Sequence, residues 1–172
     1  IGIMRHRAVV TAAGNEANMR HHFFGRAESM LTPTKVEINV EEDMPGLYVE
    51  FWGLAPERFS LSVQSPTGEI LPREGMFLGS RELKFLFEGT TIQAYYQDAG
   101  QARRDQLIFL RFKDMVKGIW TINVYPEDAV TGNFHMWLPM QGMVDGAVYF
   151  LRPTPDVTIT SPGDAEGPMT AG

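Results

Sequence analysis

The sequence predicts a mainly β protein built as a two-layer antiparallel sandwich, and two features carry that prediction. Between residues 30 and 152, apolar and polar side chains alternate in about nine short runs, the period of strands that are buried on one face. Turn signals rich in proline and glycine separate these runs at regular spacing, and no window of comparable length shows a helical period. We therefore expect a jelly-roll-type sandwich, a topology that needs about eight strands.

The individual strands can be placed along the middle of the chain. Alternation is clearest over residues 36–41, 47–52 and 59–64. Met44-Pro45-Gly46 supplies the turn before the second run, and Ser65-Pro66-Thr67-Gly68 supplies a tight turn after the third. Further strands are expected at 83–88, 91–97, 106–112, 119–125, 132–138 and 146–151. The predicted core of the sandwich includes Phe51, Phe59, Leu61, Leu110, Phe112, Trp120 and Ile122.

The composition excludes several classes of function. The chain has no cysteine, so it has neither a disulfide framework nor a thiolate metal site. Its net charge of −6 argues against a nucleic-acid partner, because phosphate binding needs a cationic face. No apolar run approaches the roughly 18 residues of a membrane span. The chain begins at Ile1 rather than methionine, so we expect the true N-terminus to lie upstream.

The most distinctive motif is the run Ala-Val-Val-Thr-Ala-Ala-Gly-Asn-Glu at residues 8–16, in which a β-type segment ends in small residues. Gly14 lets the backbone turn and a substrate approach closely, so the amide of Asn15 can be presented to a developing oxyanion. The small Ala12 and Ala13 leave room for a substrate side chain. A buried strand followed by an asparagine-containing turn explains the same residues without any catalytic role.

This run resembles the core strand of the subtilisin-like serine proteases that ends in the oxyanion-hole asparagine. The resemblance implies that Asn15 is an oxyanion donor and that Thr11, Ala12, Ala13 and Gly14 line the primary specificity pocket. The family usually has glycine after Asn-Glu, and this chain has Ala17, so the local turn differs.

Two further likenesses extend to the rest of the chain. The proline-rich segment 155–165, followed by Met169-Thr170-Ala171-Gly172, is similar to the segment of the family that returns to the protease core. The tracts 47–52, 65–69, 118–122 and 137–139 resemble the jelly-roll domain inserted in the clostridial Csp-type germination proteases and their bacterial relatives. The implied division is a partial subtilisin-like core segment over 1–29, an inserted jelly-roll sandwich over 30–152, and a partial return segment over 153–172.

The resemblance implies an internal fragment of a bacterial serine endopeptidase that hydrolyses peptide bonds through an acyl-enzyme. The aspartate, histidine and serine of the triad are absent here, so we expect this chain alone to be inactive, with no cofactor and no metal. Its expected partners are the remaining protease core, a protein or peptide substrate through the full-length parent, and another copy of itself through unpaired strand edges. The compartment stays open between cytoplasmic or spore-associated and secreted.

Two other functions remain open. The chain fits a free-standing sandwich that binds a glycan or a protein, or part of a catalytically dead pseudoprotease. Trp52, Trp120 and Trp137 invite a sugar-binding interpretation, although core packing is the usual role of tryptophan in sandwiches. His21-His22 is a possible metal pair without a visible third ligand, and a solvated loop is the favoured interpretation. Glu41-Glu42-Asp43 lacks EF-hand spacing and is interpreted as a solvated turn.

Overall fold

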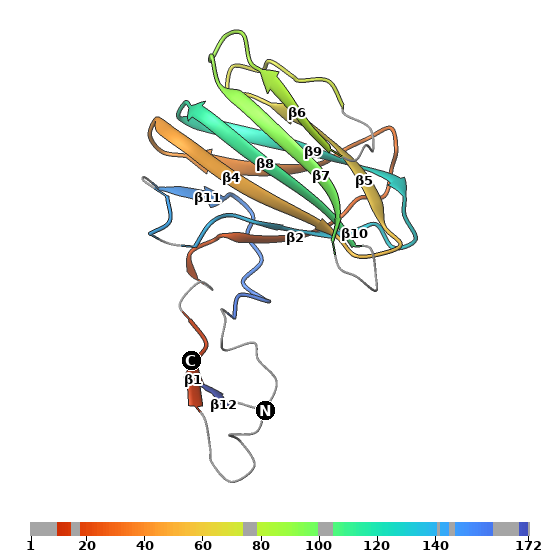
Figure 1. The fold of residues 1–172 in the computed structure, drawn as a ribbon, viewed down its shortest axis with the longest axis vertical. Coiled ribbons are helices and arrows are strands. Elements are labelled where there is room, and N and C mark those ends of the chain that lie inside the picture. The colour runs from red at the N-terminus through yellow and green to blue at the C-terminus, as the bar shows by residue number, and fades with distance from the viewer. Residues whose placement is uncertain are drawn as a thin grey trace.

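The computed structural model describes residues 10–14, 18–73, 79–99, 105–140, 142–144, 147–159 and 169–171. Within these ranges, twelve strands form three sheets and no α-helix is present (Figure 1). Within these residues, no helix is long and apolar enough to cross a bilayer.

Two antiparallel sheets make up the sandwich. The six-stranded sheet has the order β2 (His22–Arg26), β10 (Asn133–Trp137), β4 (Met44–Gly53), β8 (Asp105–Met115), β7 (Thr91–Ala99) and β6 (Gly79–Lys84). The four-stranded sheet has the order β11 (Val148–Phe150), β3 (Thr34–Val40), β9 (Gly118–Asp128) and β5 (Arg58–Gln64).

The winding of the chain confirms the predicted fold class. From β2 to β5 and again from β8 to β11, each strand lies in the opposite sheet to the one before it. One sheet contains the run β2-β10-β4-β8 and the facing sheet contains the run β3-β9-β5. This is the strand order of a jelly roll. The strand of a jelly roll that would follow β5 in the chain is here reduced to a single bridge between Gln64 and Ile70. In addition, β6 and β7 form a hairpin that lies beside β8.

Aromatic side chains fill the space between the two sheets. The ring of Trp120 is met edge-on by Phe85, at 5.1 Å between centroids, and by Phe112, at 5.7 Å. At the other end of the core, Phe51 contacts Phe134 and Phe59 with centroid separations of 5.2 and 5.3 Å. The seven side chains predicted to be buried are all at most 3% exposed, which confirms the sequence-based core: Phe51, Phe59, Leu61, Leu110, Phe112, Trp120 and Ile122.

Two elements differ from the sequence-based prediction. The strand expected at 83–88 ends at Lys84, because Phe85 turns into the core and the carboxylate of Glu69 accepts hydrogen bonds from the backbone N–H groups of Leu86 and Phe87. The segment after His21, expected to be a loop, is instead strand β2. It pairs with β10 in the register Trp137 to His22, a long-range partnership that local pattern does not reveal.

The third sheet is a two-stranded parallel ladder formed by the two flanks of the sandwich. β1 (Val10–Ala12) pairs with β12 (Met169–Ala171), with Val10 opposite Met169 and Ala12 opposite Ala171. In Figure 1 this ladder lies apart from the sandwich, beyond the end of β2. Segments from opposite ends of the chain are therefore joined outside the jelly roll.

Gly132 is a position where the close approach of two loops requires glycine. Its φ is +74°, and a Cβ there would lie 2.1 Å from the carbonyl oxygen of Ala27. Gly89 has a φ of +73° with nothing within 4 Å of its Cβ position.

We predict that Gly89→Ala costs about 1–2 kcal/mol of unfolding free energy, the penalty of a left-handed backbone. Gly132→Ala should cost about 1–3 kcal/mol more through the clash. Urea denaturation measures both; equal losses would contradict this packing.

Candidate functional site

Of the predicted pocket-wall residues, Thr11 and Ala12 lie on the parallel ladder and Ala13 and Gly14 follow it, whereas Asn15 lies outside the described residues. Thr11 pairs with Thr170, and the backbone N–H of Ala13 donates to the carbonyl oxygen of Ala171 at 2.8 Å, which extends the ladder by one hydrogen bond. Gly14 follows with a φ of +90°, a left-handed conformation suited to glycine. Gly14 is the last described residue before Asn15.

Among the described residues, the ladder forms a small sheet of its own. It has two strands, and the side chains of Ala12 and Ala171 are exposed. Parallel sheets are ordinarily buried and contain more strands than this. The described residues thus place Thr11 and Ala12 on a short parallel ladder.

A hydrogen-bonded seam between residues 20–24 and 148–154, here called the exit seam, holds the two flanks together where they leave the sandwich. The N–H of Phe150 donates to the carbonyl oxygen of Arg20 at 3.0 Å, and the guanidinium of Arg20 donates to the carbonyl oxygen of Leu151 at 3.1 Å. The same guanidinium lies over the ring of Tyr149, 4.2 Å from its centroid, in a cation–π contact.

The seam continues into a histidine pair that was not predicted from the sequence. His22 Nδ1 lies 2.9 Å from the carbonyl oxygen of Thr154, so this nitrogen carries the proton and donates. His22 Nε2 then accepts from Nδ1 of His135, at 3.0 Å. The ring of His22 also stacks on Trp137, at 3.9 Å between centroids. Two neutral imidazoles with fixed tautomers thus connect β2, β10 and the C-terminal flank.

The expectation of a solvated loop at His21-His22 is wrong. His22 is 1% exposed, and His21 Nε2 lies 3.1 Å from the carbonyl oxygen of Val148. Among the described residues, no group of three or more histidine, aspartate or glutamate side chains is arranged to hold a metal ion. Both histidines therefore join the flanks to the sandwich, and the pairing of β2 with β10, which buries His22, is the physical reason for the difference.

Burial lowers the pKa of both imidazoles in this pair. For His22 it outweighs the hydrogen bond to Thr154 and the nearby Asp156 carboxylate, which raise the pKa. For His135 burial is again the main cause, and the charge on His22 lowers the pKa further. Burial of the two rings therefore makes protonation of the pair less favourable in the folded protein than in the unfolded chain.

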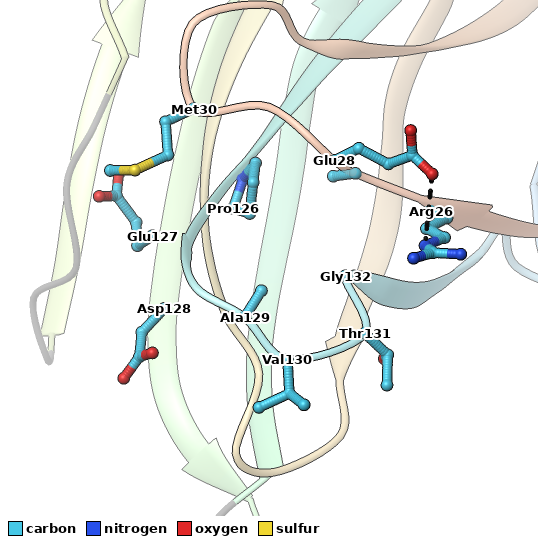
Figure 2. Close-up of a pocket in the computed structure, with 11 residues that line it drawn as sticks. Arg26, Glu28, Met30, Pro126, Glu127, Asp128, Ala129, Val130, Thr131 and Gly132 are labelled. Carbon is cyan, nitrogen blue, oxygen red and sulfur yellow. Dashed lines mark ion pairs between the residues drawn. The ribbon is translucent and has the colours of Figure 1, made fainter.

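A cleft with a volume of about 570 Å³, here called the acidic cleft, is lined mainly by residues 26–28 and 126–132 (Figure 2). Arg26 and Glu28 lie on one side of it and Glu127 and Asp128 on the other, and Arg26 and Glu28 pair at 3.5 Å. The carboxylate of Glu127 is bound by the guanidinium of Arg73 and the hydroxyl of Ser60. Three of the four charged side chains that line the cleft, those of Arg26, Glu28 and Glu127, thus interact with other protein groups. Few charged groups in the cleft therefore remain available to bind a ligand.

Glu57, a buried carboxylate missed in the sequence, fixes the loop that lines this cleft. It is 4% exposed and accepts hydrogen bonds from the N–H and hydroxyl of Thr131, both at 2.8 Å, and from the N–H of Gly132 at 3.0 Å. Burial alone raises the pKa of Glu57, but these hydrogen bonds outweigh it and leave the pKa below its ordinary value. No local pattern distinguishes this residue from surface glutamates.

The charged turn at residues 41–43 agrees with its interpretation as solvent-exposed. All three of its residues are exposed. The carboxylate of Glu41 accepts from the hydroxyl of Tyr149 at 3.1 Å, and that of Asp43 accepts from the N–H of Lys117 at 2.8 Å. These side chains therefore support neighbouring loops.

Glu57→Gln should destabilise the loop, because an amide N–H₂ group would face backbone N–H donors. We expect a loss of about 1–3 kcal/mol of unfolding free energy at pH 7. Since the folded pKa is depressed, the stabilisation by Glu57 is present above pH 4.5 and is lost as the pH falls further. Urea denaturation at pH 7 and pH 4 should therefore show a smaller gap between wild type and variant at pH 4. Glu28→Gln, at an exposed ion pair, is the control, and an equal loss there would refute the assignment.

The histidine pair predicts a second pH dependence of stability. Because the folded pKa of both imidazoles is lowered, their full contribution is present above about pH 6.5 and is lost as the pH falls toward the folded pKa. His135→Gln keeps a donor toward His22 but removes one titrating group, so its urea midpoint should fall less between pH 7.5 and 5.5 than that of wild type. An unchanged slope would show that the pair does not titrate in this window.

Comparison with known proteins supports the fold. No protein-family model matches the sequence, and no curated protein matches it. Among solved structures, the chain is similar to the Clostridium perfringens CspB protease, with a TM-score of 0.82 and 23% sequence identity. The match covers 98% of this chain and 35% of that protease, so this chain spans about a third of its neighbour's length. The two share a fold that includes a jelly-roll sandwich.

Proposed function

We propose that this chain is an internal section of a bacterial subtilisin-like serine endopeptidase, with the jelly roll inserted between two segments of the protease core. The observation that carries the proposal is the parallel pairing of β1 with β12. Both flanks bear the motifs that resemble subtilisin-like core strands, and they meet in the orientation that strands of an α/β core require. The likeness of nearly the whole chain to a part of a protease supports the same function.

In this proposal, the two strands of the ladder are neighbours in the protease sheet. Residues 1–29 and 153–172 belong to the core and residues 30–152 to the insertion, although β2, within the first range, pairs with β10 in the sandwich. The outer edges of β1 and β12 would accept the remaining core strands, or another copy of this chain when those strands are missing.

The catalytic role within this section falls to Asn15, three residues after β1 in the sequence. Its amide would donate to the oxyanion that forms when the serine of the parent enzyme attacks a peptide carbonyl. Thr11, Ala12, Ala13 and Gly14 would form the wall of the pocket for the adjacent substrate side chain. The triad residues would come from sequence outside this chain.

Two buried serines of this chain already have structural roles. The hydroxyl of Ser60 donates to Glu127 and accepts from Arg73, and the hydroxyl of Ser62 accepts from Asn123 at 3.2 Å. These partners favour a nucleophile supplied by the parent, and we propose that the isolated chain hydrolyses no peptide.

The test uses the full-length protein encoded by the gene that contains this chain. Wild type should be labelled by a fluorophosphonate reporter at a serine outside residues 1–172 and should cleave a peptide substrate. Asn15→Ala should lower kcat by about 10²–10³-fold, the loss known for an oxyanion donor of subtilisin itself rather than a value obtained from this structure. Asn18→Ala, at an exposed asparagine nearby, is the matched control.

Two outcomes would contradict the proposal in different ways. An unchanged kcat in Asn15→Ala would remove this residue from the mechanism. A full-length protein that has the subtilisin-like segments but is never labelled would be a pseudoprotease, in which the sandwich is the functional part.

A further inference from the structure

The hydrogen bonds of the histidine pair run in one direction, and this fixes where each proton lies. The carbonyl oxygen of Thr154 can only accept, so Nδ1 of His22 carries a proton and Nε2 of the neutral ring is an acceptor. Nδ1 of His135, 3.0 Å from that acceptor, must then donate to it. In the neutral pair, the one unused lone pair is therefore on Nε2 of His135.

This nitrogen is the point at which a further proton can enter the pair. Nε2 of His135 has no hydrogen-bond partner among the described residues, and it is not one of their buried unpartnered atoms. His135 also lines a cleft of about 330 Å³, together with Leu54 and Val130. His22, by contrast, is 1% exposed. Solvent therefore reaches the pair through His135.

One added proton leaves the contact between the two rings intact. When His135 is doubly protonated, its Nδ1 still donates to Nε2 of His22, and the hydrogen bond becomes charge-assisted. If the proton moves across to His22, that ring donates from both nitrogens, to Thr154 and to His135. Either arrangement places a single hydrogen between the two facing nitrogens.

A second added proton does not fit the same geometry. Both facing nitrogens, 3.0 Å apart, would then carry hydrogens, and two imidazolium rings would lie with their centroids 5.2 Å apart. Burial lowers the pKa of both rings, and the charge on His22 further lowers the pKa of His135, so the two rings titrate in separate steps. The second step must break the contact between them.

The surrounding charges do not replace that contact. Four elements around the pair carry a charged group: Arg26 on β2, Glu50 on β4, Glu57 in the loop after β4, and Asp156 on the C-terminal flank. The first three interact with other protein groups. Asp156 raises the pKa of His22, but one carboxylate balances one added charge and not two.

The C-terminal flank is the side of the pair that can give way. Beyond the pair itself, Thr154 is bound to β2 through its N–H, which donates to the carbonyl oxygen of His22 at 2.8 Å, and its hydroxyl, which accepts from the N–H of Phe24 at 3.1 Å. The next three residues, 155–157, are exposed. His135, by contrast, lies on a strand that is paired on both sides.

Separation of Thr154 from His22 relieves the doubly protonated state. A buried imidazolium that has lost its partner is costly, because water no longer solvates its charge. When Thr154 moves away, water reaches the ring of His22. Residues 148–151 remain in place, because Phe150 and Leu151 bind the backbone carbonyls of Arg20 and Glu37 independently of the pair.

We propose that the histidine pair is a two-proton release for the C-terminal flank. The first proton enters at Nε2 of His135 and leaves the exit seam closed. The second proton separates residues 152–159 from β2. The device lies within the sandwich and the seam, so it does not depend on the protease assignment.

NMR of the whole chain between pH 8 and pH 4 tests the order of events. Long-range ¹H–¹⁵N spectra of the imidazoles should show hydrogen on Nδ1 of both rings at pH 8, and one proton should bind before Thr154 changes. With the second proton, the exchange protection of the Thr154 amide should fall at least about tenfold. The amide of Leu151, bound to the carbonyl oxygen of Glu37, should stay protected at the same pH.

Two variants separate the pair from the general charge of the flank. His135→Gln removes one imidazolium and can turn its amide oxygen toward Nε2 of a protonated His22, so Thr154 should stay protected to a lower pH than in wild type. Arg152→Gln, at the exposed ion pair with Glu37, is the control and should leave the pH of release unchanged.

Each remaining outcome overturns the proposal. Hydrogen on Nε2 of His135 at pH 8 would remove the one-way chain of hydrogen bonds. Loss of Thr154 protection with the first proton would reverse the order of events. Protection that survives two protons would show that the ring of His135 moves instead of the flank. Simultaneous loss at Thr154 and Leu151 would indicate unfolding, and an equal shift in Arg152→Gln would assign the release to overall charge.

Discussion

The exit seam between residues 20–24 and 148–154 is the constraint on which the rest of the structure depends. A jelly roll could in principle release its two ends at distant points. Here the backbone of Arg20 binds that of Phe150, and the N–H of Thr154 donates to the carbonyl oxygen of His22 at 2.8 Å. The chain is therefore forced to leave the sandwich beside the place where it entered.

This constraint explains how a very short parallel ladder can form. An isolated two-stranded pair is marginal at best in water, and closing a long loop costs entropy that three residue pairs do not repay. Folding of the sandwich and its seam meets most of that cost before β1 and β12 touch. The jelly roll thus brings the two flanks into register, and the lowered pKa values of the histidine pair predict that the stability of this arrangement depends on pH.

The sequence was sufficient for the features that depend on local pattern. Alternation of side chains predicted the strands at 36–41, 47–52 and 59–64 and the burial of Trp120, because one-faced burial imposes a period of two. The apolar run around Thr11 predicted a strand there, whereas the strand at Met169 was predicted only from the family resemblance. The role of Asn15 could be proposed only from resemblance, and it lies outside the described residues.

The features that the sequence did not reveal all depend on partners distant in the chain. His22 became part of a buried strand because β10 pairs with it, and Glu57 became structural because the loop at 131–132 folds over it. The hydroxyl of Tyr48 likewise contacts the sulfur of Met143, although 95 residues separate the two in the sequence. None of these contacts leaves a local signature, since each residue type also occurs in ordinary loops.

The most direct measurement of the central claim is the distance between the two flanks in solution. The chain has no cysteine, so Ala12→Cys and Ala171→Cys introduce unique sites for nitroxide spin labels at exposed, paired positions. The account predicts strong dipolar broadening in the doubly labelled protein. A spectrum equal to the sum of the two singly labelled proteins would contradict it, because the flanks would then leave the sandwich independently.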